Sequence, residues 1–282
     1  GMGNTAAGMG IITDVHFTEG LIEGMKGLGF QSNNMYLREG NWLKDGYCAA
    51  DLPSTGYMEM AEQTGIHSLY FPSGRRITDL TLETLQEGTE VIWKESPNGV
   101  VFRRIGYVAP YNQENSWLLN VSKFKTHGMG MTLCGKNLQG ICVSPYVRFC
   151  ENEKATSQHP EYVLKDFQPE FPKHVAALHA QHLEAGIPRW DRPGTNYNSG
   201  YGMERWAQRT CDSLSMTNVG LNIIEGIYGR NGNGFMNGPG PDGKSEDFLT
   251  NILVFGKDTF RVDIIGTWLA GQRDRLCSAS HP

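Results

Sequence analysis

The chain has 282 residues, of which 25 are basic and 30 acidic, so the formal net charge at pH 7 is −5. This length fits one large α/β domain or two small ones, and either can bury a sizeable core. The mildly acidic balance, without a basic run, argues against nucleic acid and anionic membranes as partners. No apolar run approaches the roughly 20 residues that a membrane-spanning helix needs. Glycine is frequent, at 35 residues, which indicates many tight turns.

The N-terminal part of the sequence predicts two helices around a strand. A side-chain oxygen at Thr13 or Asp14 can cap a helix over residues 15–28, where apolar residues keep a helical spacing. Residues 34–39 are typical of a strand, and a second helix is expected over residues 56–63. Helix, strand and helix in this order are the signature of an α/β protein.

The middle of the chain changes character twice. An antiparallel hairpin is expected near residues 90–106, because the Asn-Gly pair at 98–99 is a strong turn signal. A further strand is expected over residues 116–123. Residues 144–208 are rich in proline, aromatic residues and histidine, and we interpret them as an irregular insertion over the core, with one helix near residues 173–185.

The C-terminal part resumes the core pattern at residues 220–224 and ends in a strand–turn–helix unit over residues 249–269. We therefore expect a single domain over residues 1–282. Its class is α/β, with a mixed, mostly parallel central sheet and flanking helices.

Ligands of open α/β sheets bind beyond the carboxyl ends of the strands, so the residues there are the first candidates. Lys123, Lys125 and His127 close one expected strand, and a glycine turn leads into a helix that carries Lys136 and Asn137. The cations and the amides at the helix start would together bind phosphate or carboxylate. The alternative, slightly favoured by spacing alone, is that the lysines are solvated edge residues and the histidine satisfies a local hydrogen bond.

Acidic residues follow two other expected strands. Glu225 stands beside a glycine-rich run that includes Gly226 and Asn233, where an acid can hold a metal or act as a base. A flexible connection is the alternative interpretation of that run. Asp258 is placed to cap the last helix, and Asp263 lies inside it. These two acids either stabilise the helix electrostatically or face the lysines across a pocket.

The cysteine and histidine patterns point away from a metal cluster. None of the six cysteines forms a C-x-x-C pair, so the spacings of zinc ribbons and ferredoxin clusters are missing, and buried free thiols are expected. This argues against an iron–sulfur cluster in this chain. His179 and His182 share a helix face, which makes a metal site conceivable, but a surface or packing role is favoured.

The run Lys-Phe-Lys-Thr-His at 123–127, with Lys-Asn-Leu-Gln-Gly at 136–140, resembles the K-x-K-T-H … K-N-x-x-G signature of the domain-of-unknown-function 362 family. Residues 10–14, 224–227 and 255–263 are also similar, so the likeness covers nearly the whole chain in order. The resemblance implies a mixed α/β fold and no established activity. Some relatives carry ferredoxin-type iron–sulfur modules or Tat export signals, and neither is visible here.

The resemblance also implies a set of site residues. Relatives usually show Asp where Glu225 stands, and they carry an initial strand before residue 13 that is missing here. The motif match marks the following candidate positions: Lys123, Lys125, His127, Lys136, Asn137, Glu225, Asp258 and Asp263.

Three functional hypotheses follow. In the first, the protein is an enzyme or binding protein for a small anionic metabolite: the lysines bind the anion, His127 is an acid–base group or metal ligand, and the acids hold a divalent cation or position water. In the second, it is an accessory protein without chemistry that binds a redox or exported enzyme through the aromatic-rich residues 190–206. The third, an iron–sulfur or zinc protein, is the least favoured. The sequence does not decide whether the protein is cytoplasmic or exported.

Overall fold

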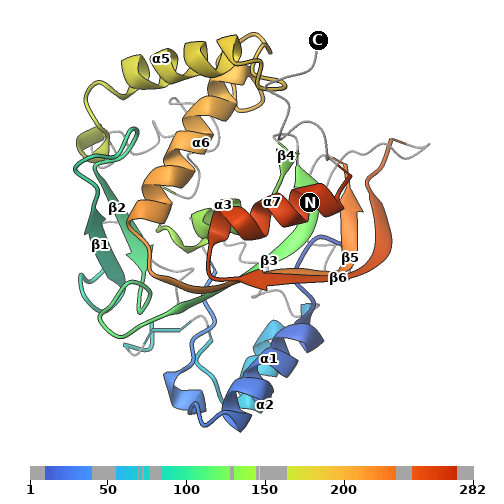
Figure 1. The fold of residues 1–282 in the computed structure, drawn as a ribbon. Helices are drawn as coiled ribbons and strands as arrows, with labels where there is room; N and C mark the ends of the chain where they lie inside the picture. The colour runs from blue at the N-terminus through green and yellow to red at the C-terminus, as the bar shows by residue number, and fades with distance from the viewer. Residues whose placement is uncertain are drawn as a thin grey trace.

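The computed structural model describes residues 10–39, 55–68, 70–71, 73–75, 84–127, 130–143, 146, 164–232 and 243–271. Helices surround two β-sheets, one of four strands in the order β4-β3-β5-β6 and one formed by the pair β1–β2 (Figure 1). The predicted α/β class is confirmed. Among the described helices, none is both long and apolar enough to cross a bilayer.

The four-stranded sheet is built around one parallel pair, β3 (Leu118–His127) and β5 (Val219–Asn231). β4 (Gly130–Met131) and β6 (Glu246–Gly256) add to this pair on either side, and both run antiparallel to their neighbours. The sheet is therefore mixed as expected, with its parallel pairing confined to β3 and β5 among the described strands. β4 follows β3 after two residues, and so short a connection can only return antiparallel.

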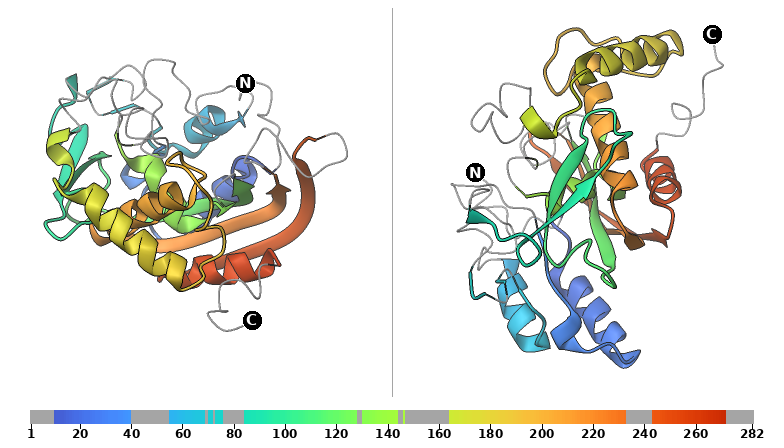
Figure 2. Two further views of the ribbon diagram at one scale, coloured as in Figure 1. Left: turned by 90° about the horizontal axis from the view of Figure 1, so that it is seen from above. Right: turned by 90° about the vertical axis from the view of Figure 1, so that its left-hand side faces the viewer.

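The two faces of this sheet are covered by different parts of the chain (Figures 1 and 2). Helices α3 (Cys134–Asn137) and α7 (Thr259–Leu269) pack on one face, where Phe124, Ile224 and Val262 form a small buried cluster. The segment that leads into α1 (Val15–Gly27) lies on the opposite face, because it contacts side chains that alternate with those of the cluster.

The predicted N-terminal helices are confirmed, with their caps. Asp14 accepts a hydrogen bond from the amide of Phe17 at 2.9 Å and begins α1. Helix α2 (Tyr57–Thr64) ends at Gly65, whose φ of 73° favours glycine.

The strand predicted over residues 34–39 is wrong. A 3₁₀ helix, η2 (Ser32–Asn34), ends there, and Tyr36 forms a single bridge with His67. The hydrogen bonds of this bridge stop at Met35 and Leu37, so no ladder extends from it.

The predicted hairpin is confirmed as β1 (Val91–Glu95) paired antiparallel with β2 (Arg104–Val108). The turn forms where expected, with the amide of Gly99 donating to the carbonyl of Ser96 at 2.9 Å. β2 nevertheless begins later than expected, because Asp212 of α6 (Gly200–Ser215) accepts hydrogen bonds from the three successive amides of residues 100–102.

The larger core lies between this hairpin and the helices α5 (Phe171–Glu184) and α6, and it extends to Ile22 of α1 and Met60 of α2. The short helices η7 (Leu138–Ile141) and η10 (Leu164–Asp166) connect to it. Phe102 is fully buried there and stacks on Phe167, with ring centroids 4.8 Å apart. The expected helix of the insertion is α5. Four buried side chains of the described insertion belong to this core: Tyr146, Phe167, Phe171 and Val175.

The cysteines fit the expectation of free thiols where they are described. Cys134 and Cys142 are buried and free, whereas Cys211 is free and exposed. The other three cysteines lie outside the described residues.

Candidate functional site

Both strands of the parallel pair are longer than the sequence predicts, and this moves two candidate residues. Lys123 lies in the interior of β3, and it is His127 that ends this strand. Glu225 lies in the interior of β5, which continues to Asn231. The interpretation of residues 226–231 as a loop is therefore wrong.

Close packing explains the glycines in that part of β5. A Cβ at Gly226 would lie 3.0 Å from a Phe124 atom, and one at Gly229 would lie 2.9 Å from the same side chain. The register with β3 shifts at this point, between Lys123 and Lys125. The glycines thus let the strand pass over a buried aromatic ring.

The centre of the candidate site is a buried ion pair. Lys123 and Glu225 are register partners on β3 and β5, and the Lys123 Nζ donates to both carboxylate oxygens at 3.0 and 2.8 Å. The carboxylate also accepts hydrogen bonds from the amides of Asp14 at 3.0 Å and Ile227 at 2.7 Å. Two amides and one ammonium group therefore compensate a carboxylate that is 0% exposed.

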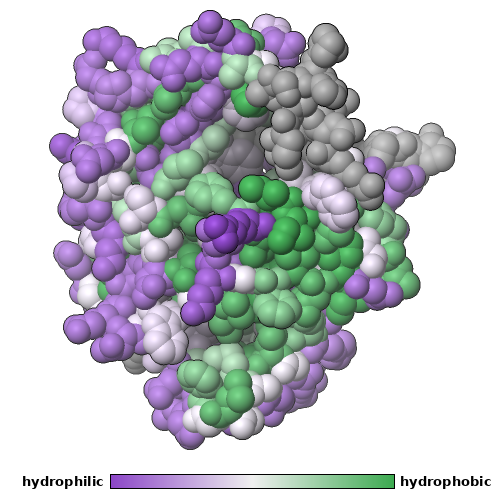
Figure 3. Space-filling view, viewed as in Figure 1, coloured by the Kyte–Doolittle hydropathy of each residue, from purple (hydrophilic) through white to green (hydrophobic). Residues whose placement is uncertain are grey.

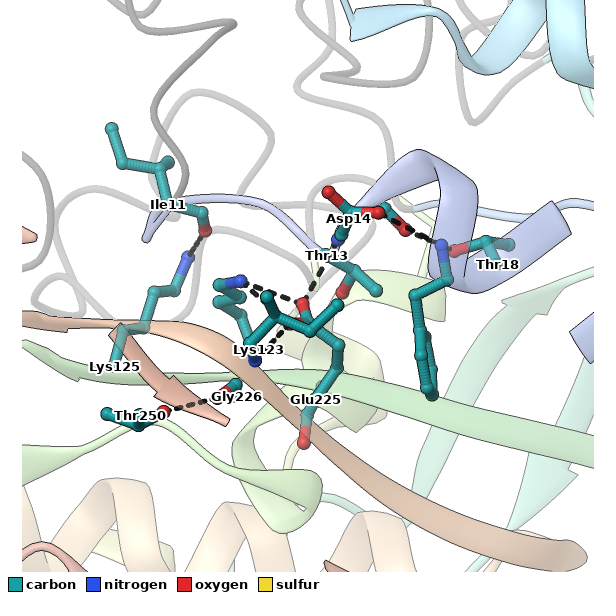
Figure 4. Close-up of polar contacts among 12 residues, drawn as sticks. Ile11, Thr13, Asp14, Thr18, Lys123, Lys125, Glu225, Gly226 and Thr250 are labelled. Atoms are coloured by element: carbon teal, nitrogen blue, oxygen red, sulfur yellow. Dashed lines mark hydrogen bonds and ion pairs between the residues drawn. The ribbon is translucent and has the colours of Figure 1, made fainter. Parts of the chain in front are cut away.

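The same face of the sheet holds the N-terminal segment in place, as Figure 4 shows. The Lys125 Nζ donates to the carbonyl oxygen of Ile11 at 2.6 Å. The Tyr57 hydroxyl donates to the carbonyl oxygen of Thr13 at 2.8 Å. Residues 10–14, 123–127 and 224–227, which are far apart in the sequence, thus form one hydrogen-bonded cluster.

Beyond the ion pair, basic and aromatic side chains meet at the end of β3. We call this group the β3 cationic site and define it as Lys125, His127, Lys136, Tyr197 and Trp206. Lys125 is included because its charge acts on His127. The Lys136 Nζ lies 4.9 Å from the centroid of the Trp206 ring. The His127 ring is 6.4 Å from the rings of both Tyr197 and Trp206.

Burial and like charge perturb the basic groups of this site. Burial lowers the pKa of Lys125 to about 8, and Lys136 is the neighbouring charge that lowers it most. Burial also lowers the pKa of His127 to about 4, with further lowering by Lys136 and Lys125. The imidazole is therefore neutral at pH 7, and positive charge is concentrated on the lysines.

The three acids predicted as metal ligands are not brought together. Asp263 of α7 accepts hydrogen bonds from the amides of Cys134 and Gly135, each at 2.8 Å, so it caps α3. Burial raises the pKa of this carboxyl to about 6. α7 packs on the sheet face opposite to Glu225, since a Cβ at its Gly266 would touch Ile224.

Asp258 is exposed and caps α7 by accepting from the amide of Arg261 at 2.9 Å. In the part of the chain that the structure describes, no three His, Cys, Asp or Glu side chains are grouped to hold a metal ion. The divalent metal stays a prediction.

The remaining predicted residues have structural contacts or lie outside the described part. The Asn137 side-chain amide donates to the Asn120 Oδ1 at 2.9 Å and to the carbonyl oxygen of Val121 at 3.1 Å. The carbonyl oxygen of Gly226 accepts from the Thr250 hydroxyl. Asn233 lies outside the described residues.

Two histidines of α5 also bind separate partners. The His179 Nε2 lies 2.8 Å from the carbonyl oxygen of Trp190. The His182 Nδ1 lies 2.6 Å from the buried carboxylate of Glu204. These contacts agree with the packing role that the sequence favoured.

Sequence reasoning missed Tyr197 and Trp206 as members of the site. Both belong to the aromatic-rich stretch that we interpreted as a surface for a partner protein. Arg230 was missed as well: its charge acts on Lys125, and its guanidinium binds Asp247 at 2.5 and 2.6 Å. Arg230 comes close to Lys125 only because β5 pairs with β3, where these two residues are register partners.

The fold and this site define a mixed α/β protein with basic and aromatic side chains gathered where its central parallel strands end. The chain belongs to the family described as Domain of unknown function (DUF362), whose model matches residues 2–268. The resemblance carried by the lysine motifs is thereby confirmed. No curated protein and no solved structure matches the chain.

Proposed function

We propose that this protein binds a small anionic ligand, a phosphate or a carboxylate, at the β3 cationic site. One observation carries the proposal: the Lys136 Nζ and the His127 ring lie 4.9 and 6.4 Å from the ring of Trp206. The charges of Lys136 and Lys125 add to burial in lowering the pKa of His127. Lys136 also lowers the pKa of Lys125 itself. An anion placed among these groups relieves their repulsion, which gives it a favourable binding energy.

The other members of the site suit such a ligand. A neutral imidazole at His127 can donate one hydrogen bond and accept another. It is also in the protonation state that a general base needs, so we assign His127 as the acid–base group of any reaction on the bound anion. The rings of Tyr197 and Trp206 provide apolar walls.

We assign Glu225 and Lys123 to positioning. Their ion pair and the amide of Asp14 hold the N-terminal segment against β3 and β5, next to Lys125. Because its oxygens already accept hydrogen bonds from these groups, we assign Glu225 to positioning the N-terminal segment and not to binding the ligand.

The contacts of the aromatic-rich stretch favour anion binding over the accessory-protein hypothesis. The Trp190 indole donates to the Glu204 carboxylate at 2.5 Å, and the Tyr201 ring lies edge-on to His179 at 6.1 Å. These side chains pack within the chain instead of presenting a flat aromatic surface.

Calorimetric titration of the full chain with inorganic phosphate and with citrate tests the proposal, each with and without Mg²⁺. We expect binding that weakens by about tenfold or more in Lys125→Met and in Lys136→Met, because each removes a charge-assisted contact. Lys173→Met is the matched control, since Lys173 is an exposed lysine of α5. Absence of binding to either anion, or an equal loss in the control, would contradict the proposal.

A second readout follows the histidine itself. Nuclear magnetic resonance titration should show that phosphate raises the pKa of His127 from its low value towards the ordinary one, because a bound anion stabilises the imidazolium. An unchanged pKa in the presence of saturating phosphate would place the anion elsewhere.

A further inference from the structure

We propose that Trp206 binds the anion of the β3 cationic site by donating its indole N–H to one ligand oxygen, while Lys136 binds another oxygen of the same ligand. The inference rests on the proposed function and deepens it, because it names a recognition residue and limits the ligand to anions with at least two acceptor oxygens. A phosphate and a carboxylate meet this condition, and a halide does not.

The first observation is an indole nitrogen without a partner. Trp206 is partly exposed as a residue, but its Nε1 is buried, and no group of the described residues accepts a hydrogen bond from it. Nε1 is the only polar atom of a tryptophan side chain, so this side chain is wholly unpaired. Buried polar groups in native proteins are paired in the large majority of cases, and an ion that binds there is one explanation of an exception.

A second tryptophan of the same region shows the usual arrangement. The Trp190 indole donates to the carboxylate of Glu204 at 2.5 Å. Glu204 belongs to α6 and stands two residues before Trp206. The helix therefore supplies an acceptor to the first indole, whereas the second has none among the residues that the structure describes.

The groups around the Trp206 ring are basic. The Lys136 Nζ lies 4.9 Å from the ring centroid, and the His127 ring lies 6.4 Å away. Lys125 acts on the same histidine through its charge. None of these three side chains carries a negative charge, so a group that pairs with them and with the indole N–H must bring both acceptors and negative charge. An oxyanion has these two properties.

Packing of α3 against α6 brings Lys136 to the indole. A Cβ at Gly135 of α3 would lie 3.4 Å from the Thr210 side chain of α6. Trp206 stands one helical turn before Thr210, whose hydroxyl donates to the Trp206 carbonyl oxygen at 3.0 Å. Lys136 follows Gly135 directly, so the contact between the two helices places its ammonium group beside the ring.

Helix α6 is fixed on both sides of Trp206. Before it, the fully buried Glu204 accepts the hydrogen bond from Trp190. After it, the buried Asp212 accepts hydrogen bonds from the amides of residues 100–102. A donor on a helix held in this way needs little ordering when a ligand binds, which favours affinity.

The distances allow one anion to bind both groups. A hydrogen bond from a nitrogen spans about 2.9 Å, so one oxygen can bridge donors up to about 5.8 Å apart, and two oxygens of one anion span more. The Lys136 Nζ is 4.9 Å from the centroid of the ring system that contains Nε1. The lysine stem is flexible, and we expect an entering anion to move the ammonium group off the ring and to take its place beside the indole.

Two exposed tryptophans serve as internal controls. Trp117 is 69% exposed and precedes β3, at the end of the strand opposite to His127. Trp268 is exposed as well and belongs to α7, whose outer side and the adjoining part of β6 form the continuous hydrophobic area in Figure 3. Neither residue belongs to the β3 cationic site, so an anion bound there should leave both indoles unchanged.

Nuclear magnetic resonance of the isotope-labelled full chain tests the proposal during titration with inorganic phosphate. The Trp206 indole resonance is assigned by its loss in Trp206→Phe. We expect it to move downfield as phosphate binds, because its hydrogen gains an acceptor, while the resonances of Trp117 and Trp268 stay in place. Chloride at the same ionic strength should leave the Trp206 resonance unchanged. An equal shift with chloride would overturn the limitation to oxyanions.

Calorimetry with phosphate completes the test. Trp206→Phe keeps an aromatic ring and removes the N–H, and it should weaken binding by about tenfold, since a hydrogen bond to a charged group is lost. Trp117→Phe is the matched control and should bind as the wild type does. If phosphate binds and depends on Lys136, but the Trp206 resonance stays in place and Trp206→Phe binds equally well, this inference fails and the proposed function stands. If the wild type binds neither phosphate nor citrate, both fail.

Discussion

Lys123 and Glu225 face each other across the parallel strands β3 and β5, and their side chains form an ion pair at 2.8 Å that is almost completely buried. Removing two charges from water is costly, and here amide donors from Asp14 and Ile227 complete the compensation. The pair therefore couples the sheet to the N-terminal segment.

Breaking this pair from one side should destabilise the protein strongly. Glu225→Gln is expected to lower the free energy of unfolding by about 3–5 kcal/mol, because it leaves the Lys123 ammonium buried without its counter-charge. Urea denaturation measures the change. Glu170→Gln removes the partner of the exposed Lys173 and should change stability by less than about 0.5 kcal/mol. Equal effects of the two substitutions would show that the buried pair contributes no more than a surface pair.

The low pKa of Lys125 gives anion binding a pH dependence with a definite sign. Its ammonium group loses its proton as the pH rises through about 8, instead of near the ordinary 10.5. Affinity for sulfate, whose own charge is constant, should therefore fall by about tenfold between pH 7 and pH 9. Calorimetry in Lys125→Arg provides the control, since arginine stays charged over this range. A constant or rising affinity in the wild type would contradict the assignment of Lys125.

Asp263 should make stability depend on pH in the acidic range. Burial raises its pKa from 3.8 to about 6, so the folded state binds the proton more tightly than the unfolded state does. The stabilisation is fully present below pH 3.8 and is lost as the pH rises through about 6, by at most about 3 kcal/mol. Asp263→Asn should remove this component from the difference between wild-type and variant stability curves. A difference curve that is flat between pH 4 and pH 6 would exclude it.

Two glycine substitutions should change stability in opposite directions. Gly24→Ala in α1 meets no atom within 4 Å and should stabilise the protein by about 0.5–1 kcal/mol. Gly226→Ala places a Cβ 3.0 Å from Phe124 and 3.1 Å from the carbonyl oxygen of Ile252, and should destabilise it by about 1–3 kcal/mol. Thermal unfolding of both variants under one condition gives the comparison. Stabilisation by the second substitution would show that β5 can move away from Phe124.

Local features of the fold could be predicted because their causes are local. The cap of α1 needs only Asp14 and an amide three residues later, and the end of α2 needs only the positive φ of Gly65. Turn chemistry likewise predicted the hairpin at Gly99, but not the carboxylate of Asp212, which binds the following amides from a distant helix.

The candidate site was predictable in its residues and not in its arrangement. The lysine motif marked Lys123 and Lys125, but the pairing of Lys123 with Glu225 depends on a strand register that neither segment specifies alone. Glycine indicates either a turn or close packing, and only the position of Phe124 decides between them at Gly226. Asp263 and Glu225 lie on opposite faces of the sheet, and the spacing of residues along the chain could not show this.

The parallel pair has a consequence for synthesis on the ribosome. Lys123 and Glu225 are 102 residues apart in the sequence. The edge of β3 that pairs with β5 therefore stays unpaired in a nascent chain until β5 has emerged. Non-local pairing of this kind is slow to form, and the waiting segment is exposed to aggregation and to chaperones. Chains stalled after residue 215 should be digested rapidly by added protease, whereas chains that extend beyond α7 should resist it. Resistance of the shorter chains would mean that the hairpin core folds before the sheet is complete.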